Sequence, residues 1–275
     1  MTQTQTLTKF SDGNSIPQIG LGVWQATQEQ AAASVCHALK SGYRHIDTAA
    51  IYQNEEGVGQ GIKQSGVVRN DIFVTTKVWN DAQGYEEATA ALNASLDRLQ
   101  LDYVDLLLIH WPTPKQDRFV DTWRAFIDAQ KAGKVRSIGV SNFNADHLQR
   151  LIDETNVAPV INQIELHPYL QQAELRAFHH EHHIVTQAWS PLGQGEVLND
   201  AVIGAIASVH GKTPAQIIIR WHMQLGNVAI PKSVTPSRIE SNFQVFDFEL
   251  SNQEMAQIAQ LDQGRRMGPD PLTFG

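Results

Sequence analysis

The sequence predicts an α/β fold: a (β/α)8 barrel with an N-terminal β-hairpin and extra C-terminal loop and helix segments. Eight short hydrophobic runs typical of strands alternate with segments whose apolar residues recur three and four apart, as in helices. No Pro/Gly/Ser-rich linker and no block of like charge divides the chain. Its 275 residues leave one or two domains open, but they suit one barrel of about 250 residues. We therefore expect a single domain over residues 1–275.

The elements follow in chain order. Asp12 and Gly13 predict the turn of the hairpin. Strands are expected after it at residues 19–24, 44–47, 72–77, 104–110, 135–141, 160–163, 184–189 and 228–231. Helix starts are marked by a Thr27/Gln30 capping box and by Pro214 and Pro236, each of which follows a threonine. Because strand and helix alternate without a linker, the sheet should be parallel and closed.

Charge and composition exclude several classes of function. A net charge of -8 argues against a nucleic-acid partner, which requires a basic surface. No eighteen uncharged apolar residues run together, and residues 1–10 lack the apolar core of a signal peptide. The single cysteine, Cys36, cannot form an internal disulfide, which suits a reducing compartment. We expect a cytoplasmic monomer that acts on a small molecule and contacts neither membrane nor nucleic acid.

Four polar residues lie at or just beyond predicted strand ends, where a barrel places its active site. Asp47, Lys77 and His110 end hydrophobic runs, and Tyr52 follows Asp47 by five residues. Taken singly, Asp47 could cap a helix, His110 could be a core histidine and Tyr52 could be an ordinary surface residue. Lys77 is harder to explain structurally, because a buried ammonium is costly unless a partner such as Asp47 balances it.

Together the four residues can deliver a proton to a carbonyl oxygen. A free tyrosine titrates near pKa 10, so Tyr52 alone is a weak acid. An ammonium about 4 Å away, at an effective dielectric of about 20, contributes roughly 4 kcal/mol, or a shift of up to about 3 units. We therefore expect Lys77 to lower the pKa of Tyr52 toward neutral pH. Asp47 would hold Lys77, and a neutral His110 would orient the carbonyl.

The motifs around these residues resemble the aldo-keto reductase family over nearly the whole chain. The matching segments are residues 42–52, 76–79, 101–106, 110–112, 138–143, 162–168 and 230–235. Residues 20–25 and 268–271 are most similar to those of bacterial 2,5-diketo-D-gluconate reductases. The resemblance implies a catalytic tetrad of Asp47, Tyr52, Lys77 and His110, with hydride transfer from a nicotinamide cofactor to a carbonyl.

The cofactor site predicted from the residues lies after the eighth strand. The chain has no G-x-G-x-x-G motif, and Gly57, Gly59 and Gly61 have the wrong spacing for one, so they indicate close helix packing. Lys232 and Arg238 instead flank the start of a helix, which suits a 2′-phosphate. The resemblance then implies NADPH, bound by Trp24, Asp47, Ser141, Asn142, Gln163, Trp189, Ser190, Leu192, Gln194, Gly195, Lys232, Ser233, Val234, Thr235, Arg238 and Asn242.

Within that set, Trp189 would stack on the nicotinamide while Ser141, Asn142 and Gln163 bind its carboxamide. Two segments that break the strand–helix rhythm, residues 190–199 and 264–275, are candidate lids, the first over the pyrophosphate. The chain departs from many relatives in having Trp189 in place of tyrosine. It also has Ser241 where they have glutamate, with Glu240 one place earlier, which puts an acidic contact to the adenine in doubt.

The substrate site should be aromatic, with Trp24, Trp79 and Trp111 around Tyr52 and His110. The connection at residues 112–118 is short and the tail is brief, which predicts an open pocket for compact carbonyls. Expected substrates are aldehydes and ketones such as small keto sugars or acids, methylglyoxal-like dicarbonyls and keto esters.

Two alternatives remain. Lys77 could form a Schiff base in an aldolase-type barrel. The barrel could also bind a cofactor without turnover, because a fold does not guarantee activity. His179 and His183, expected on one helix face, could bind a metal, but a solvent-facing helix end explains them better and no third ligand is evident, so we expect no metal site.

Overall fold

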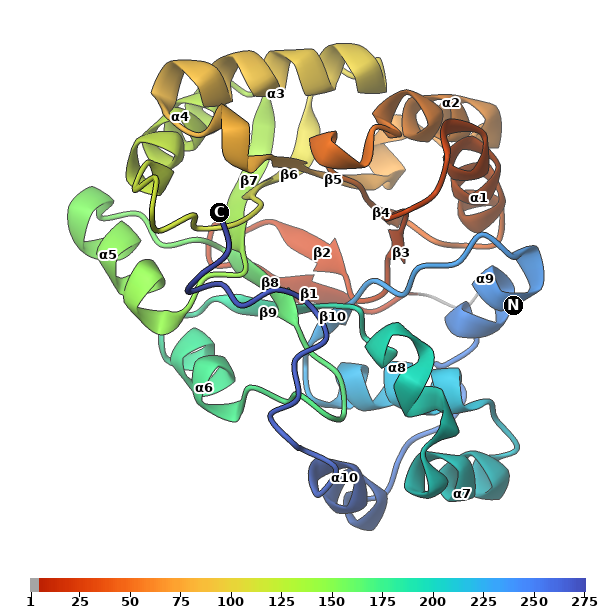
Figure 1. Cartoon of the computed structure of the whole chain (residues 1–275). Coiled ribbons are helices and arrows are strands. Elements are labelled where there is room, and N and C mark those ends of the chain that lie inside the picture. Colours follow the sequence, from red (N-terminus) through yellow and green to blue (C-terminus); the bar gives the residue numbers. More distant parts are fainter. Residues whose placement is uncertain (1–4) are drawn as a thin grey trace.

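The structure, a computed structural model, describes residues 5–275. The first four residues of the N-terminal stretch considered above lie outside this range. Eight parallel strands form the centre of the molecule, and helices surround them (Figure 1). In sheet order they are β3 (Leu21–Gly22), β4 (His45–Asp47), β5 (Phe73–Val78), β6 (Val104–Ile109), β7 (Val135–Ser141), β8 (Ile161–Glu165), β9 (Val185–Trp189) and β10 (Val228–Ala229).

Single bridges close the sheet into the predicted barrel. Ile19 pairs with Ala229 and Gly22 pairs with Lys232, both in parallel. The two strands at this seam are shorter than predicted, because pairing continues there only as isolated bridges, and Pro231 has no N–H to donate. Gly22 is required at the seam, since a Cβ would lie 2.9 Å from the carbonyl oxygen of Ile230.

The predicted hairpin is present at the N-terminal ends of the strands. It consists of β1 (Leu7–Lys9) and β2 (Ser15–Pro17), which pair antiparallel. Its Phe10 and Ile16 are buried against Phe73, Ile161 and other apolar residues inside the barrel. The hairpin thus closes the end of the barrel opposite the polar strand ends, which leaves the C-terminal ends as the accessible mouth.

The helices pack their apolar faces against the outside of the sheet (Figure 1). They are α1 (Gln28–Lys40), α2 (Glu55–Ser65), α3 (Tyr85–Leu99), α4 (Phe119–Lys131), α5 (Ala145–Thr155), α6 (Ala173–Glu181), α7 (Ala201–His210), α8 (Pro214–Gln224), α9 (Pro236–Phe243) and α10 (Asn252–Ala259). The Thr27/Gln30 capping box is confirmed, and Pro214 and Pro236 begin α8 and α9.

The glycines of α2 allow close helix packing, as predicted. A Cβ on Gly57 would lie 2.2 Å from the carbonyl oxygen of Gln28, and one on Gly59 would lie 2.3 Å from that of Leu99. These contacts are with the residue that begins α1 and the residue that ends α3. The glycine cluster therefore serves helix contacts instead of a phosphate.

The prediction that His179 and His183 share a solvent-facing helix end is wrong. His179 is fully buried in α6, where it contacts Thr186 Oγ1 at 2.8 Å and Asn162 Nδ2 at 3.0 Å. The helix ends at Glu181, and His183 lies beyond it with a φ of 56°. Within residues 5–275, no three His, Cys, Asp or Glu side chains are grouped to hold a metal.

No single helix in residues 5–275 is long and apolar enough to cross a membrane. Taken as a pair, α7 and α8 have sufficient length and apolar character, but a 91° bend separates them.

Candidate active site

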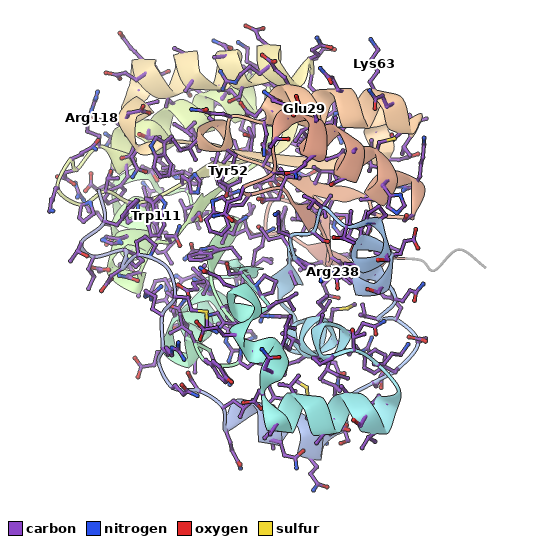
Figure 2. The ribbon with its side chains drawn as sticks, turned by 45° about the vertical axis from the view of Figure 1, so that its right-hand side comes forward. Glu29, Tyr52, Lys63, Trp111, Arg118 and Arg238 are labelled. Atoms are coloured by element: carbon purple, nitrogen blue, oxygen red, sulfur yellow. The ribbon has the colours of Figure 1, made fainter. Side chains whose placement is uncertain are left out.

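A cavity of about 580 Å³ opens at the C-terminal ends of the strands. Most of the residues predicted for the site line it: Trp24, Asp47, Tyr52, Trp79, His110, Trp111, Ser141, Asn142, Gln163, Trp189, Ser190, Gln194 and Lys232. They come from every part of the barrel, which brings them together although they are far apart in sequence. In Figure 2, Tyr52 and Trp111 lie to the left of Arg238, which belongs to α9.

A buried ion pair lies beneath the cavity. Lys77, on β5, donates to Asp47 Oδ1 at 2.5 Å and to the carbonyl oxygen of Thr48 at 2.8 Å. Both charged side chains are almost completely excluded from solvent. Burial, the largest single influence, would lower the pKa of Lys77, but the interactions with Asp47 and Tyr52 together outweigh it and hold the pKa above its usual value. Lys77 is therefore protonated at neutral pH.

Tyr52 lies between this ion pair and the cavity. A short 3-10 helix, η1 (Ala50–Tyr52), follows β4 and turns the ring back over the barrel mouth, where Lys77 Nζ is 5.2 Å from the ring centroid. The prediction of a lowered phenol pKa is wrong. Burial raises the pKa of Tyr52 above 10, since it outweighs the opposing charge of Lys77. Tyr52 consequently keeps its proton throughout the neutral range.

His110 follows β6 and faces Tyr52 across the cavity. The ring centroids of Tyr52 and His110 are 5.8 Å apart, and those of Trp79 and His110 are 4.9 Å apart, both in edge-to-face arrangements. Burial, assisted by the charge of Lys77, holds the pKa of His110 well below 6.5. The imidazole is therefore neutral, as expected from its environment, and it can act as a hydrogen-bonding group without carrying charge.

Polar side chains from three further strand ends form one wall of the cavity. Ser141 Oγ donates to the carbonyl oxygen of Gln163 at 2.8 Å, and Gln163 Nε2 donates to Asp47 Oδ2 at 2.7 Å. Asn142 Oδ1 accepts a hydrogen bond from Trp189 Nε1 at 2.7 Å, which fixes the indole ring at the mouth. The ion pair, the amide side chains and this flat ring are thus one connected network.

Aromatic side chains form the opposite wall. Trp79 and Trp111 approach Phe274, with ring centroids 6.2 Å and 4.6 Å away. Phe274, in the C-terminal segment, encloses this wall more than the sequence suggested. Trp24 is 44% exposed at the rim, so the cavity stays accessible from that side. Sequence reasoning did not assign Gly22, Val23, Gln25, Ile51, Ile230, Met267, Gly268, Pro269 or Phe274, which also line the cavity.

Both predicted lid segments lie at the mouth. Residues 190–199 contain η4 (Gly193–Asn199), which is kinked at Gln194 and Gly195. The C-terminal segment crosses the barrel (Figure 1) and is bound by Glu165, a buried carboxylate that accepts from the N–H groups of Met267 and Gly268 at 2.6 and 2.9 Å. Arg265 and Glu196 connect the two segments through an ion pair of 2.6 Å.

The remaining predicted cofactor residues lie outside the cavity lining. Ser233, Val234, Thr235, Arg238 and Asn242 extend from the end of β10 into α9, next to Lys232 at the cavity edge, and Leu192 and Gly195 lie in residues 190–199. Arg238 is exposed in the first turn of α9.

Glu240 contacts α1 and not the cavity edge. Its Oε1 lies 2.9 Å from His37 Nε2. Glu240 is therefore not placed to make the contact to the adenine that the glutamate at position 241 makes in many relatives.

The family of the chain follows from comparisons with known proteins. The Aldo/keto reductase family matches residues 18–263. An aldo-keto reductase of Mycolicibacterium smegmatis is 60% identical over 265 residues, 96% of each chain, and methylglyoxal reductase DkgA of Escherichia coli is 56% identical over 272 residues, 98% of each chain. The crystal structure of a Gox0644 mutant in complex with NADPH superimposes with a TM-score of 0.96 at 50% identity, covering 99% of this chain and 100% of that one. The chain belongs to the aldo/keto reductase family.

Proposed function

We propose that this protein reduces small aldehydes and ketones to alcohols with NADPH, using Tyr52 as the proton donor. The observation that carries the proposal is the Lys77–Asp47 pair, buried directly beneath a protonated Tyr52 and a neutral His110 that share one cavity. Membership of the family supports the reaction class. The relative DkgA, a methylglyoxal reductase, supports a compact dicarbonyl as substrate.

The residues present suit a nicotinamide cofactor. The Ser141, Asn142 and Gln163 side chains offer hydrogen-bonding groups for a carboxamide, and Trp189 offers a flat surface beside them. At the opposite edge, Lys232 and the first turn of α9 suit a phosphate. NADPH, when bound, would supply the hydride that attacks the carbonyl carbon.

The chain itself would supply the proton and the geometry. His110 would hold the carbonyl oxygen by a hydrogen bond, and Tyr52 would donate its phenolic proton to that oxygen as the alcohol forms. Lys77 would stabilise the phenolate left behind, which solvent then reprotonates. Trp79, Trp111 and Phe274 would exclude water from the reacting carbon.

The aldolase alternative is poorly supported. A Schiff base needs a neutral amine in contact with substrate. Lys77 is held protonated by Asp47 and does not line the cavity. A barrel that binds cofactor without turnover would have no need for the costly buried ion pair, so its retention favours catalysis.

A substrate panel tests the proposal directly. Purified protein is mixed with NADPH and methylglyoxal, 2,5-diketo-gluconate, aromatic aldehydes or keto esters, and absorbance of the reduced cofactor is followed. We expect oxidation of NADPH with at least methylglyoxal. No oxidation with any substrate would refute the enzymatic proposal, and covalent trapping of a carbonyl substrate by borohydride on Lys77 would favour the aldolase.

The pH dependence of this activity follows from the direction of the two pKa shifts. Tyr52 loses its proton only above its ordinary pKa of 10, and His110 gains one only well below 6.5. We therefore expect kcat/KM for methylglyoxal to be flat between about pH 6.5 and 9. Steady-state rates across this range measure it, and a decline through pH 8 would indicate that the Tyr52 pKa is depressed.

Preference for NADPH over NADH is expected to depend on Lys232 and Arg238. Replacing both, Lys232→Met with Arg238→Ala, should weaken NADPH binding by about 10²-fold if each contact contributes about 1.5 kcal/mol, and change NADH binding little. Dissociation constants from fluorescence titration provide the comparison. Lys63→Met, on the surface of α2 (Figure 2), is the matched loss of a cation away from the site. Equal weakening of both cofactors would rule out a phosphate contact.

The oligomeric state and the location of the protein are also part of what we propose. We infer a monomeric, single-domain enzyme of the cytoplasm; the single cysteine supports a reducing compartment, and the lack of a linker supports one domain. Light scattering of the purified protein tests the monomer, and a stable dimer would overturn it.

A further inference from the structure

Gln187 lies inside the barrel directly behind the polar wall of the cavity. It belongs to β9 and is completely buried, and it does not line the cavity itself. Its Oε1 accepts a hydrogen bond of 3.1 Å from Gln163 Nε2. The same Nε2 donates its other hydrogen to Asp47 Oδ2 at 2.7 Å. Because an ionised carboxylate only accepts, the nitrogen of Gln163 must face Asp47.

Both hydrogens of the Gln163 amide are consequently used within the barrel. Gln163 can offer only its Oε1 to the cavity, and no donor in residues 5–275 bonds to that oxygen. Both hydrogens of the Asn142 amide are also used, since its Nδ2 donates to the carbonyl oxygen of His110 at 3.0 Å and to Ser141 Oγ at 3.1 Å. The Ser141 hydroxyl donates to the Gln163 backbone. These three side chains therefore offer acceptors and no free hydrogen.

We propose that Gln187 is a specificity-determining positioning residue, which keeps this wall free of donors so that it selects a ligand group with N–H hydrogens. This inference rests on the proposed function, in which that group is the carboxamide of the nicotinamide cofactor. Without an acceptor at position 187, the second N–H of Gln163 is free to turn toward the cavity. The wall would then also accept a ligand that presents only an oxygen there.

The hydrogen bond to Gln163 leaves the other half of the Gln187 amide unpaired. Its own Nε2 is buried and has no hydrogen-bond partner in the described part of the chain. An unpaired buried N–H is unfavourable. Gln187 nevertheless directs its oxygen toward Gln163, which indicates that its orientation is set by the hydrogen bond to Gln163 Nε2. A residue chosen only for stability would not leave this group unpaired.

A cofactor pair that differs in this one group tests the inference. The 3-acetylpyridine analogue of NADP⁺ has a methyl ketone in place of the carboxamide and thus brings no N–H hydrogens. Dissociation constants for NADP⁺ and the analogue are measured by protein fluorescence for the wild type and for Gln187→Met, which matches the shape of Gln187 without its acceptor. We expect the wild type to prefer NADP⁺, and the preference to fall about five-fold in the variant.

Two further variants separate recognition from general disturbance. Thr186→Val removes a buried hydrogen bond to His179 from the neighbouring position of β9, on the other face of the strand, and should leave the preference unchanged. Gln187→Glu retains an oxygen acceptor and should retain the wild-type preference. Circular dichroism verifies that each variant is folded, and Gln187→Leu replaces Gln187→Met if that variant is not.

The outcomes distinguish this inference from the proposed function. If the wild type binds NADP⁺ but Gln187→Met has the same preference, or loses affinity for NADP⁺ and the analogue equally, the role of Gln187 is refuted. The proposed function is not affected by that result. Loss of the preference in Gln187→Glu as well would show that the acceptor is not the cause. If the wild type does not bind NADP⁺ at all, the proposed function fails first.

Discussion

Replacing Tyr52 with Phe is expected to lower kcat for methylglyoxal reduction by about 10²- to 10⁴-fold, the usual contribution of a positioned general acid. The substitution removes only the phenolic O–H, so the ring keeps its contact with His110 and with the Lys77 ammonium. NADPH should therefore bind with nearly unchanged affinity. Stopped-flow single-turnover rates and fluorescence titration separate the two effects.

Tyr85→Phe is the matched control for this change. Tyr85 begins α3, is 44% exposed and donates to Asp128, well away from the residues that line the cavity. Removing its hydroxyl should leave kcat unchanged. Activity retained by Tyr52→Phe would show that another group donates the proton, and His110 would be the next candidate to replace.

Replacing Lys77 with Met is expected to reduce stability as well as activity. The change leaves the Asp47 carboxylate buried without its cation, which costs about 3–5 kcal/mol in similar buried pairs. Tyr52 also loses the charge that would stabilise its phenolate. We therefore expect both kcat and the free energy of unfolding to decrease. Urea denaturation measures stability, and NADPH oxidation measures the rate.

A double variant distinguishes the ion pair from simple loss of packing. Lys77→Met with Asp47→Leu removes both charges, and its free energy of unfolding should exceed that of Lys77→Met alone. Its activity should remain low, because the ammonium is still missing. If the double variant has a lower free energy of unfolding than Lys77→Met, the uncompensated Asp47 charge does not explain the instability of Lys77→Met.

Sequence reasoning located the tetrad residues because their positions depend on a simple rule. Strand ends follow from hydrophobic runs, and a barrel brings these ends to one mouth. This rule alone predicts that Asp47, Lys77 and His110 lie near one another. The pKa of Tyr52 could not be obtained in this way, since it depends on how completely the ring and the ion pair are desolvated, which only the packing determines.

Other features had no adequate signal in the sequence. Met267 and Phe274 lie in a segment without periodicity, so it indicated a lid but not which side chains enter the cavity. His179 lies in a run of polar residues, yet its helix position turns it toward Thr186 and the interior. Gln187 lies in the strand predicted at residues 184–189, but the direction of its hydrogen bond depends on a partner on the next strand.

The attachment of the C-terminal segment has a practical consequence for handling the protein. Glu165 binds the backbone of Met267 and Gly268, and the last residue, Gly275, packs so closely that a Cβ would lie 2.5 Å from the Thr113 side chain. A purification tag or fused reporter attached there would compete for the space beside the aromatic wall. The N-terminal hairpin lies at the opposite end of the barrel, so fusions belong on that side if substrate preferences are to be measured undisturbed.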